Sequence, residues 1–535
     1  MRSPRPAARH KWLKGSLAVA ALALVAVPAG AASVTNSAAR ALTVDMNIGP
    51  AQLDPANNTG LNDTIVGNFY VRLTTLATKP GPSGTRQVNP KRVRPYLARS
   101  WKITKGGTVY TFNLRRGTRF SDGTPVTAAA VKFSFERDLT MGLAGAYFLD
   151  DGVPGNIQSI ATPNTHTVVI KVKLPDPNLL QAWAAPPAAI VNPRAVQAHG
   201  GVQKSKTNAW MASHVAGSGP YILKSYQPNV RMVMVANPRY FGPRPSARQV
   251  TVNFIPSEAT LLLRAKKAQA DVSLGLTPQS LHTLKGTKGI RIISNETTLT
   301  EWLGFVDDAP PFNNEKVRAA LARSIPYSQI ISHVAYGYGT PYFGPFPPAM
   351  PFFHKEALPK YDVAKAKQLL QASGVSLPIS ASIIIQAGNP GDQQIATLLQ
   401  GLWKQVGVNL TIDQLSPADY INKLLSHKGV QLFLREDGPG VIDPGYYLDY
   451  DMRCNISFNL SDICIPAADK LLTTARQTTS VKKRTQLYAE ITKLWVAQVP
   501  KIPLFAIKAA AVLHSRVKGY VFNQVYPDFS TWTIK

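Results

Sequence analysis

The clearest alternation of hydrophobic and polar positions lies in residues 108–115. Tyrosine, phenylalanine and leucine at every second position, ending at Leu114, alternate with smaller or polar side chains, which is the period of a half-buried strand. Gly106 and Gly107 supply a turn before it. Residues 122–125 (Asp-Gly-Thr-Pro) form a second turn, and Thr127 is suited to cap a helix. We therefore expect a hairpin followed by a helix with these apolar positions: Val131, Phe133, Phe135 and Leu139.

Two further helices are predicted from caps and apolar spacing. Asn313 or Asn314 can cap a helix whose residues 317, 320 and 321 are apolar, and Asp362 can cap a second helix that ends before Gly374. Both helices are expected to have a structural role rather than contact with ligand.

Three other segments are assigned by composition. The apolar residues 65–76 predict a helix, and residues 429–434 predict a strand. The proline- and glycine-rich residues 79–95 predict a loop. We find no internal repeat in the sequence.

The first 31 residues predict export. Five basic residues precede an apolar run at residues 16–28, and small residues at 29–31 offer a cleavage site. The run is shorter than the ~20 residues that span a bilayer, and no cysteine for a lipid anchor follows it. We expect a periplasmic or extracellular protein exported by a Sec-type signal peptide, with retention of the uncleaved segment as a tether as the alternative.

Export bears on the two cysteines, Cys454 and Cys464, which have nine residues between them. An oxidising compartment favours a disulfide that pins a loop. A metal site is the alternative, but two thiols without neighbouring histidines are a poor ligand set.

Length and charge narrow the class of protein. A chain of 535 residues is too long for one core and suggests about three domains. The formal net charge is +29, or +24 without the five basic residues of the signal. Because the basic residues are dispersed, we favour a general effect on solubility and envelope contacts over an anionic ligand.

No focused basic module for nucleic acid is recognisable, and no enzyme or metal motif is found. We expect no catalytic residues, no metal and no cofactor.

The segment from Leu97 to Leu139 resembles the signature of the family 5 extracellular solute-binding proteins, which are peptide, nickel and oligosaccharide receptors of ABC importers. The resemblance continues in the family's order at residues 53–55, 217–221, 237–242 and 310–321. It implies an α/β fold of the periplasmic-binding-protein type, a large three-domain clamp with a hinge between two lobes. The implied domains are residues 41–82, 215–298 and 505–535 for domain I, 83–214 for domain II and 299–504 for domain III.

The resemblance also implies a ligand anchor in residues 434–448. In the family, an acidic residue shortly before an Asp-Pro pair binds the α-ammonium of a peptide, and Asp437 occupies that place here. A carboxylate suits an ammonium because charge-assisted hydrogen bonds are strong. The alternative is that Asp437 only caps the turn before Gly438.

This loop departs from the family pattern. Leu434 and Arg435 stand where a tryptophan is common, and two extra residues separate Asp437 from the Asp-Pro pair. Arginine is suited to bind a carboxylate or phosphate, so a ligand other than a standard peptide is an alternative. Weaker pocket candidates are these residues: Asn62, Asp63, Thr64, Trp302, Glu436, Tyr446 and Tyr447. For the three aromatic residues among them, core packing is the alternative.

The resemblance therefore implies a monomeric, non-enzymatic receptor. It would bind a peptide or peptide-like solute and deliver it to an ABC permease in the membrane by closing its lobes. A sensor or envelope-interaction protein built on the same clamp is one alternative. A receptor for a non-peptide anion, an oligosaccharide or a metal chelate is another. The sequence alone does not decide between transport and sensing.

Overall fold

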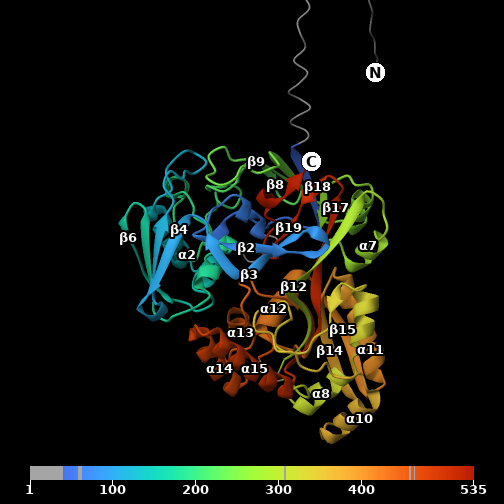
Figure 1. Cartoon of the computed structure of the whole chain (residues 1–535). Coiled ribbons are helices and arrows are strands. Elements are labelled where there is room, and N and C mark those ends of the chain that lie inside the picture. Colours follow the sequence, from blue (N-terminus) through green and yellow to red (C-terminus); the bar gives the residue numbers. More distant parts are fainter. Residues whose placement is uncertain (1–39, 58–62, 307–308, 457–458, 463, 535) are drawn as a thin grey trace, which may run out of the picture. The chain divides into compact units, whose positions relative to one another are not determined.

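The computed structural model describes residues 40–534, apart from residues 58–62, 307–308, 457–458 and 463. Residues 1–31, the expected signal peptide, lie outside the described part. The described chain is a two-lobed α/β clamp (Figure 1). No helix among the described residues is long and apolar enough to cross a membrane.

The main sheet has eleven strands among the described residues and runs through both lobes (Figure 1). Its order is β15-β14-β16-β12-β17-β11-β1-β10-β9-β8, with β13 paired to β17. The first-lobe strands are β1 (Ala41–Met46), β8 (Tyr221–Gln227), β9 (Arg231–Ala236), β10 (Gln249–Phe254) and β11 (Val272–Leu274). The second-lobe strands are β13 (Gly339–Thr340), β14 (Ile379–Gln386), β15 (Val408–Leu415) and β16 (Leu432–Asp437).

Two long antiparallel strands, β12 (Ile290–Phe305) and β17 (Lys501–His514), connect the lobes. The end of β17 pairs with β11 of the first lobe, and the end of β12 pairs with β16 of the second. The β12–β17 register shifts between Glu296 and Thr300. This break in the ladder lies between the two halves of the sheet, where a hinge needs backbone freedom.

Three smaller sheets complete the first lobe. The first sheet consists of β2 (Thr74–Pro80), β3 (Arg86–Pro95) and β19 (Val521–Phe522). The second consists of β4 (Ala98–Thr104), β5 (Val109–Leu114), β6 (Ile157–Asn164) and β7 (Thr167–Val172). The third pairs β18 (Val517–Gly519) with β20 (Thr533–Ile534). The first-lobe helices are α2 (Ala128–Met141), α3 (Ala144–Leu149), α4 (Leu179–Ala182), α5 (Pro193–Ala198), α6 (Glu258–Lys266) and α7 (Pro278–Thr283).

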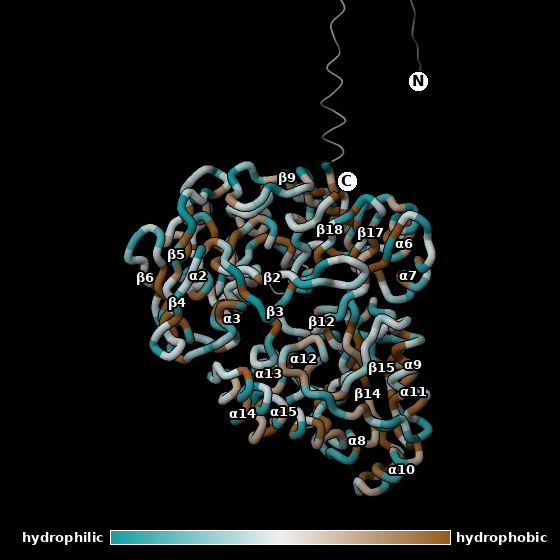
Figure 2. The backbone as a smooth tube through the Cα atoms, in the orientation of Figure 1, coloured by the Kyte–Doolittle hydropathy of each residue, from teal (hydrophilic) through white to brown (hydrophobic). Residues whose placement is uncertain are grey.

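The second lobe holds α8 (Glu315–Arg323), α9 (Tyr327–Gln329), α10 (Val363–Ala372), α11 (Pro390–Lys404), α12 (Pro417–Ser426), α13 (Pro444–Asp451), α14 (Pro466–Gln477) and α15 (Val481–Gln498). Its core is built around Trp302, Trp403 and Trp495. In the first lobe, Trp183 packs edge-on against Tyr110 and Phe112 of β5. Figure 2 shows short hydrophobic segments separated by hydrophilic ones in both lobes, as expected when each element buries only one face.

The local predictions from alternation and capping are confirmed. Strand β5 carries the predicted alternation, and the Thr127 hydroxyl accepts a hydrogen bond from the Ala130 amide at the start of α2. Asn314 and Asp362 cap α8 and α10 through their side chains.

Three segments differ from their predictions. Residues 65–76 do not form one α-helix: the 3₁₀-helix η2 (Asp63–Asn68) is followed by β2. Almost every apolar side chain from Ile65 to Leu73 is buried, and all-sided burial removes the periodicity that distinguishes helix from strand.

Residues 79–95, predicted as a loop, instead contain the hairpin of β2 and β3. The register skips residues 90–92, so Pro90 falls in the bulge, where its missing amide hydrogen costs no ladder bond. The third difference is β16, which extends to Asp437 rather than ending at residue 434.

Candidate ligand-binding site

Strand β16 positions the residues expected to bind ligand. Arg435 and Asp437 are two residues apart on it and therefore share a face, whereas Glu436 points to the other face. The antiparallel register places Trp302 of β12 opposite Arg435 and Thr300 opposite Asp437. The extension of β16 thus brings three of the predicted residues, Trp302, Arg435 and Asp437, to one surface.

These three residues line a cavity of about 350 Å³ in the second lobe. Helix α12 contributes Ile421 and Leu425, two of the exposed large hydrophobic side chains of the protein. The cavity is thus apolar on one side and charged on the other, as is common in small-molecule sites. Its charged side is formed by Arg435, Asp437, Asp451 and Lys501.

The four charges of the cavity are not equally engaged. The Lys501 ammonium donates to both carboxylate oxygens of Asp451 at 2.5 Å and lies 3.9 Å from the centre of the Trp302 ring. The nearest approach of Arg435 Nη2 to Asp437 Oδ1 is 3.9 Å, longer than a charge-assisted hydrogen bond of about 2.7–2.9 Å. Among the described residues, Asp437 therefore has no short ion pair, in contrast to Asp451, and its carboxylate can accept a hydrogen bond from a ligand cation.

The opposite face of the same strands is acidic. Glu301 of β12 lies opposite Glu436 of β16 in the register, and Asp392 near the start of α11 is close enough to act on both. Burial and the neighbouring Asp392 and Glu436 raise the pKa of Glu301 well above its usual value. Burial and Glu436 raise the pKa of Asp392 to about 7. No group of three or more His, Cys, Asp or Glu side chains suited to hold a metal ion occurs among the residues the structure describes.

The aromatic candidates of α13 are packed rather than open. Tyr446 is buried against Tyr147 and Phe148 of the first lobe, with ring centroids 5.5 and 5.7 Å apart. Tyr447 is also buried and lies 5.7 Å below the Lys501 ammonium. Tyr446 therefore joins the two lobes, and Tyr447 supports the charged side of the cavity.

The three candidates before the first helical segment are only partly described. Asn62 lies outside the described residues. Asp63 and Thr64 are the first two residues of η2.

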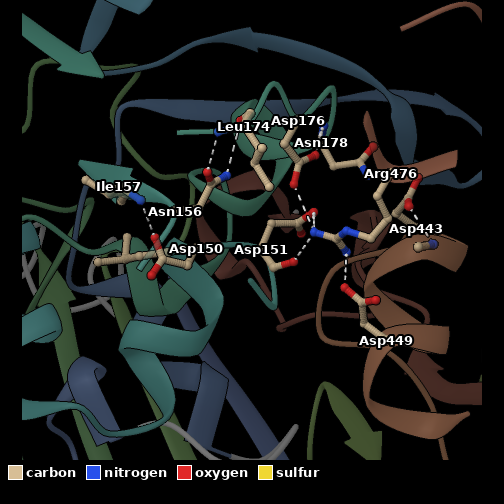
Figure 3. Close-up of polar contacts among 12 residues, drawn as sticks. Asp150, Asp151, Asn156, Ile157, Leu174, Asp176, Asn178, Asp443, Asp449 and Arg476 are labelled. Carbon is tan, nitrogen blue, oxygen red and sulfur yellow. Dashed lines mark hydrogen bonds and ion pairs between the residues drawn. The ribbon is translucent and has the colours of Figure 1, made fainter. Parts of the chain in front are cut away.

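A buried ion network joins the lobes beside this site (Figure 3). Arg476 of α14 donates through Nη2 to the main-chain oxygen of Asp151 at 2.5 Å, to Asp151 Oδ2 at 3.1 Å and to Asp176 Oδ2 at 2.9 Å. Both aspartates belong to the first lobe. On its own lobe, Arg476 Nη1 lies 3.2 Å from Asp449 Oδ2. All four side chains are almost fully buried.

Two neighbouring contacts reinforce this junction. Arg484 of α15 binds both oxygens of Asp443, at 3.0 and 2.8 Å, and reaches Asn178 Oδ1 of the first lobe at 3.3 Å. Gln181 Nε2 of α4 donates to the Ile442 main-chain oxygen at 3.1 Å. The lobes are therefore held together by polar contacts of the protein itself.

The carboxylates of the network outnumber its guanidinium groups. Burial and the adjacent Asp176 raise the pKa of Asp151 well above its usual value. Burial also raises the pKa of Asp176 and of Asp449. We infer that Asp151 is protonated while the network is buried, because a shared proton relieves the repulsion between adjacent carboxylates.

The sequence analysis missed Arg476, Arg484, Asp451 and Lys501. A signal for the two arginines exists in the helix pattern. Arg476 follows Ala468, Leu472 and Ala475 on the buried side of α14, and Arg484 precedes Leu487, Tyr488 and Ile491 on the buried side of α15. An arginine in an apolar stripe indicates a buried ion pair. Asp451 and Lys501 give no comparable local signal.

The predicted disulfide is present in the structure. Cys454 and Cys464 are bonded, with Cα atoms 4.6 Å apart, and there is no free cysteine among the described residues. The closed segment contributes Leu460 and Ser461 to the rim of the cavity. The disulfide therefore restrains one wall of the candidate site.

Comparisons with known proteins agree with this architecture. A probable D,D-dipeptide-binding periplasmic protein of Escherichia coli (strain K12) is 28% identical over 480 residues, covering 89% of this chain and 90% of the relative. A di/tripeptide-binding protein of Pseudomonas aeruginosa (strain UCBPP-PA14) is 26% identical, with 85% and 87% covered.

Solved structures of low sequence identity share the fold. A periplasmic binding protein of Helicobacter pylori in complex with the peptide STSA superposes with a TM-score of 0.79 at 22% identity, covering 92% of this chain and 98% of that one. A dipeptide-binding protein of Pseudoalteromonas sp. SM9913 in complex with Met-Leu gives 0.78 at 23% identity, covering 92% and 100%.

The strongest assignment comes from the family profile. The profile of the bacterial extracellular solute-binding proteins, family 5, matches residues 92–459. This match spans most of both lobes and includes β16 with Asp437. It describes a family of solute-binding receptors rather than enzymes. The chain belongs to the bacterial extracellular solute-binding proteins of family 5.

Proposed function

We propose that this protein is the extracytoplasmic substrate-binding component of an ABC importer and that it captures a peptide or peptide-like solute between its lobes. The observation that carries the proposal is Asp437, a weakly engaged carboxylate at the end of β16 in a cavity with an apolar side. The family membership and the peptide-binding relatives support the same function.

The proposed binding mode follows from the charges of the cavity. The ligand ammonium would donate to Asp437, and Arg435 would turn toward a carboxylate or carbonyl oxygen of the ligand. Trp302 would form the floor, with Lys501 and Asp451 holding its ring in place. Glu436 lies on the opposite face of the strand and would act on the ligand only through the electrostatic field of the site, whereas Asp63 and Thr64 would contribute main-chain hydrogen bonds from the first lobe.

Closure of the clamp is the proposed signal to the permease. A ligand that contacts both lobes binds the closed form better and therefore shifts the equilibrium toward it. In the proposed domain division, domain I comprises residues 41–82, 215–298 and 505–535, domain II residues 83–214 and domain III residues 299–504. The chain then crosses between lobes near residues 299 and 504, beside the break in the β12–β17 register.

The same proposal includes export and oligomeric state. Residues 1–31 would direct the chain across the membrane through a Sec-type signal and then be removed. The mature protein would act as a monomer outside the cytoplasm and meet the permease complex through the outer surfaces of its lobes.

A thermal-shift screen of the mature protein tests the proposal. Di- to tetrapeptides, oligosaccharides and nickel chelates are compared in wild type and in Asp437→Asn. A ligand present at 100 times its dissociation constant stabilises the folded state by about 2.7 kcal/mol. Stabilisation by a peptide that is lost in Asp437→Asn is the expected result. Stabilisation only by oligosaccharides or chelates, unchanged in the variant, would overturn the peptide assignment and leave the clamp.

A further inference from the structure

A second cavity, of about 410 Å³, lies where the first lobe meets the loop after β16. The first lobe supplies most of its wall, and Gly440, Val441 and Ile442 of the second lobe close it. This cavity shares no lining residue with the cavity that contains Asp437. It is therefore a separate feature of the junction between the lobes.

Three arginines line this second cavity: Arg72, Arg94 and Arg115. Asp528 is the single acidic residue among its lining residues. The Asp528 carboxylate already accepts hydrogen bonds from the amide and hydroxyl of Ser530 and from the Tyr526 hydroxyl. The wall of the cavity thus has a clear excess of positive charge.

Arg72 is the most unusual of the three because it is buried without a direct ion pair among the described residues. Its side chain is 1% exposed, and its guanidinium lies 5.6 and 5.1 Å from the ring centres of Tyr96 and Tyr526. Nη2 donates to the Tyr526 hydroxyl at 2.7 Å and Nη1 to the Gly67 main-chain oxygen at 3.3 Å, whereas Nε has no hydrogen-bond partner within the described part of the chain.

Other buried arginines show what Arg72 lacks. Arg137, Arg476 and Arg484 each form an ion pair with at least one buried aspartate. Arg72 has no direct ion pair with a described carboxylate, and Asp528 acts on it only electrostatically and through the Tyr526 hydroxyl. A buried guanidinium is costly unless an anion compensates it. The faces of Tyr96 and Tyr526 and the more distant Asp528 carboxylate compensate Arg72 in part, without a direct ion pair.

Arg115 is held in place for a ligand. Its Nε donates to the Tyr96 main-chain oxygen at 2.6 Å, and its guanidinium lies 5.3 Å from the centre of the Phe241 ring. These contacts fix the plane of the guanidinium and leave its terminal nitrogens without a carboxylate among the described residues. A fixed guanidinium with free donors matches a carboxylate or phosphate oxygen pair.

We propose that this cavity binds the oxyanion of a small solute, a carboxylate or a phosphate, between Arg72 and Arg115, with Arg94 at the entrance. The aromatic side chains Tyr96, Tyr240 and Phe241 form walls for an apolar part of the same solute. Because Val441 and Ile442 complete the wall only when the lobes are together, an anion bound here favours the closed form. The site does not depend on the ammonium anchor proposed for Asp437.

Titration calorimetry of the mature protein with two probes tests this site. Sodium benzoate carries a carboxylate on an apolar ring, and inorganic phosphate is an oxyanion alone. The variants are Arg115→Gln and the matched control Arg116→Gln, which removes an equal charge from the next residue, exposed and outside the cavity. Circular dichroism verifies that both variants are folded.

We expect saturable binding of at least one probe to wild type, at least 10-fold weaker in Arg115→Gln and unchanged in Arg116→Gln. Stronger binding of benzoate would indicate that the natural solute carries an apolar group beside its carboxylate. Stronger binding of phosphate would indicate that the natural ligand is inorganic phosphate or a solute with a phosphoryl group. Absence of saturable binding to wild type, or equal affinities in the two variants, would overturn the proposal. Loss of peptide binding in Asp437→Asn with retained benzoate binding would separate this site from the peptide site.

Discussion

The buried network around Arg476 predicts that replacing Asp176 with asparagine favours the open clamp. Arg476 Nη2 donates to Asp176 Oδ2 at 2.9 Å across the lobes, and the two side chains are only 5% and 4% exposed. Asparagine keeps the size of the side chain and an acceptor oxygen but removes the charge. In the open form, water solvates both side chains, so the substitution destabilises the closed form more than the open form.

The magnitude follows from the change in the type of hydrogen bond. A hydrogen bond to a charged group contributes about 1.5–3 kcal/mol and a neutral one about 0.5–1.5 kcal/mol. The closed form should therefore lose about 1–2 kcal/mol, which lowers the closed-to-open ratio by roughly 5- to 30-fold at 1.36 kcal/mol per factor of ten.

A neighbouring substitution distinguishes this reasoning from a general loss of charge. Burial and Asp176 raise the pKa of Asp151, so we infer that the Asp151 carboxyl is protonated in the closed form. An asparagine at 151 imitates that state and can still donate to Asp176. Its backbone is also suited to the positive φ of 49° at this position. Asp151→Asn should therefore change the closed-to-open ratio much less than Asp176→Asn.

Single-molecule energy transfer measures the ratio directly. Dyes are placed on Ser159→Cys in β6 and Lys367→Cys in α10, both exposed and on different lobes. The matched control is Asp45→Asn, which weakens the Asp45–Arg264 pair inside the first lobe and should leave the ratio unchanged. Equal ratios in wild type, Asp176→Asn and Asp45→Asn would refute the role assigned to the network.

Three further predictions concern stability. Arg137→Met should lower the free energy of unfolding by about 3–5 kcal/mol, because it leaves Asp54, 2.5 Å away and fully buried, without its partner; denaturant titration measures this, and a loss below 1 kcal/mol would contradict it. Burial raises the pKa of Asp138 to about 8, so the folded state binds a proton that the unfolded state releases, and this group makes the free energy of unfolding fall as pH rises from 4 to 8. Asp138→Asn should make the dependence of the unfolding free energy on pH less steep, by the equivalent of up to one proton. Unfolding titrations at several pH values that give the same slope for wild type and variant would disprove the raised pKa of Asp138. Cys454→Ser with Cys464→Ser should cost about 2–3 kcal/mol for a loop of this size, and a reductant should destabilise wild type but not the double variant in thermal melts.

Local chemistry explains which parts of the fold the sequence predicted. Strand alternation and helix capping depend only on neighbours within a few residues. The examples here are the alternation that ends at Leu114 and the caps Thr127, Asn314 and Asp362. The prediction of one helix over residues 65–76 was wrong because residues 65–74 are all buried, so their hydrophobicity has no period. The prediction of a loop over residues 79–95 was wrong because β3 holds Pro90 in a bulge of its pairing with β2, which a composition argument cannot foresee.

The candidate site was only partly predictable for a similar reason. Trp302, Arg435 and Asp437 were identified one by one, and the antiparallel register of β12 and β16 brought them together. Lys501 meets Asp451 from 50 residues away, and Arg476 meets Asp176 from 300 residues away. Such pairs depend on the way the lobes assemble, and a single sequence gives at most the hint of a charged residue on an apolar helix face.

The ammonium anchor is tested most directly by a double comparison in titration calorimetry. The peptide that stabilises the mature protein best is measured with a free and with an acetylated amino terminus, against wild type and Asp437→Asn. If Asp437 binds the ammonium, acetylation and the substitution should each weaken binding by about 10- to 100-fold, corresponding to ~1.5–3 kcal/mol, and the two effects together should be little larger than either alone. Independent, additive losses, or no effect of acetylation, would contradict the proposed mode of binding.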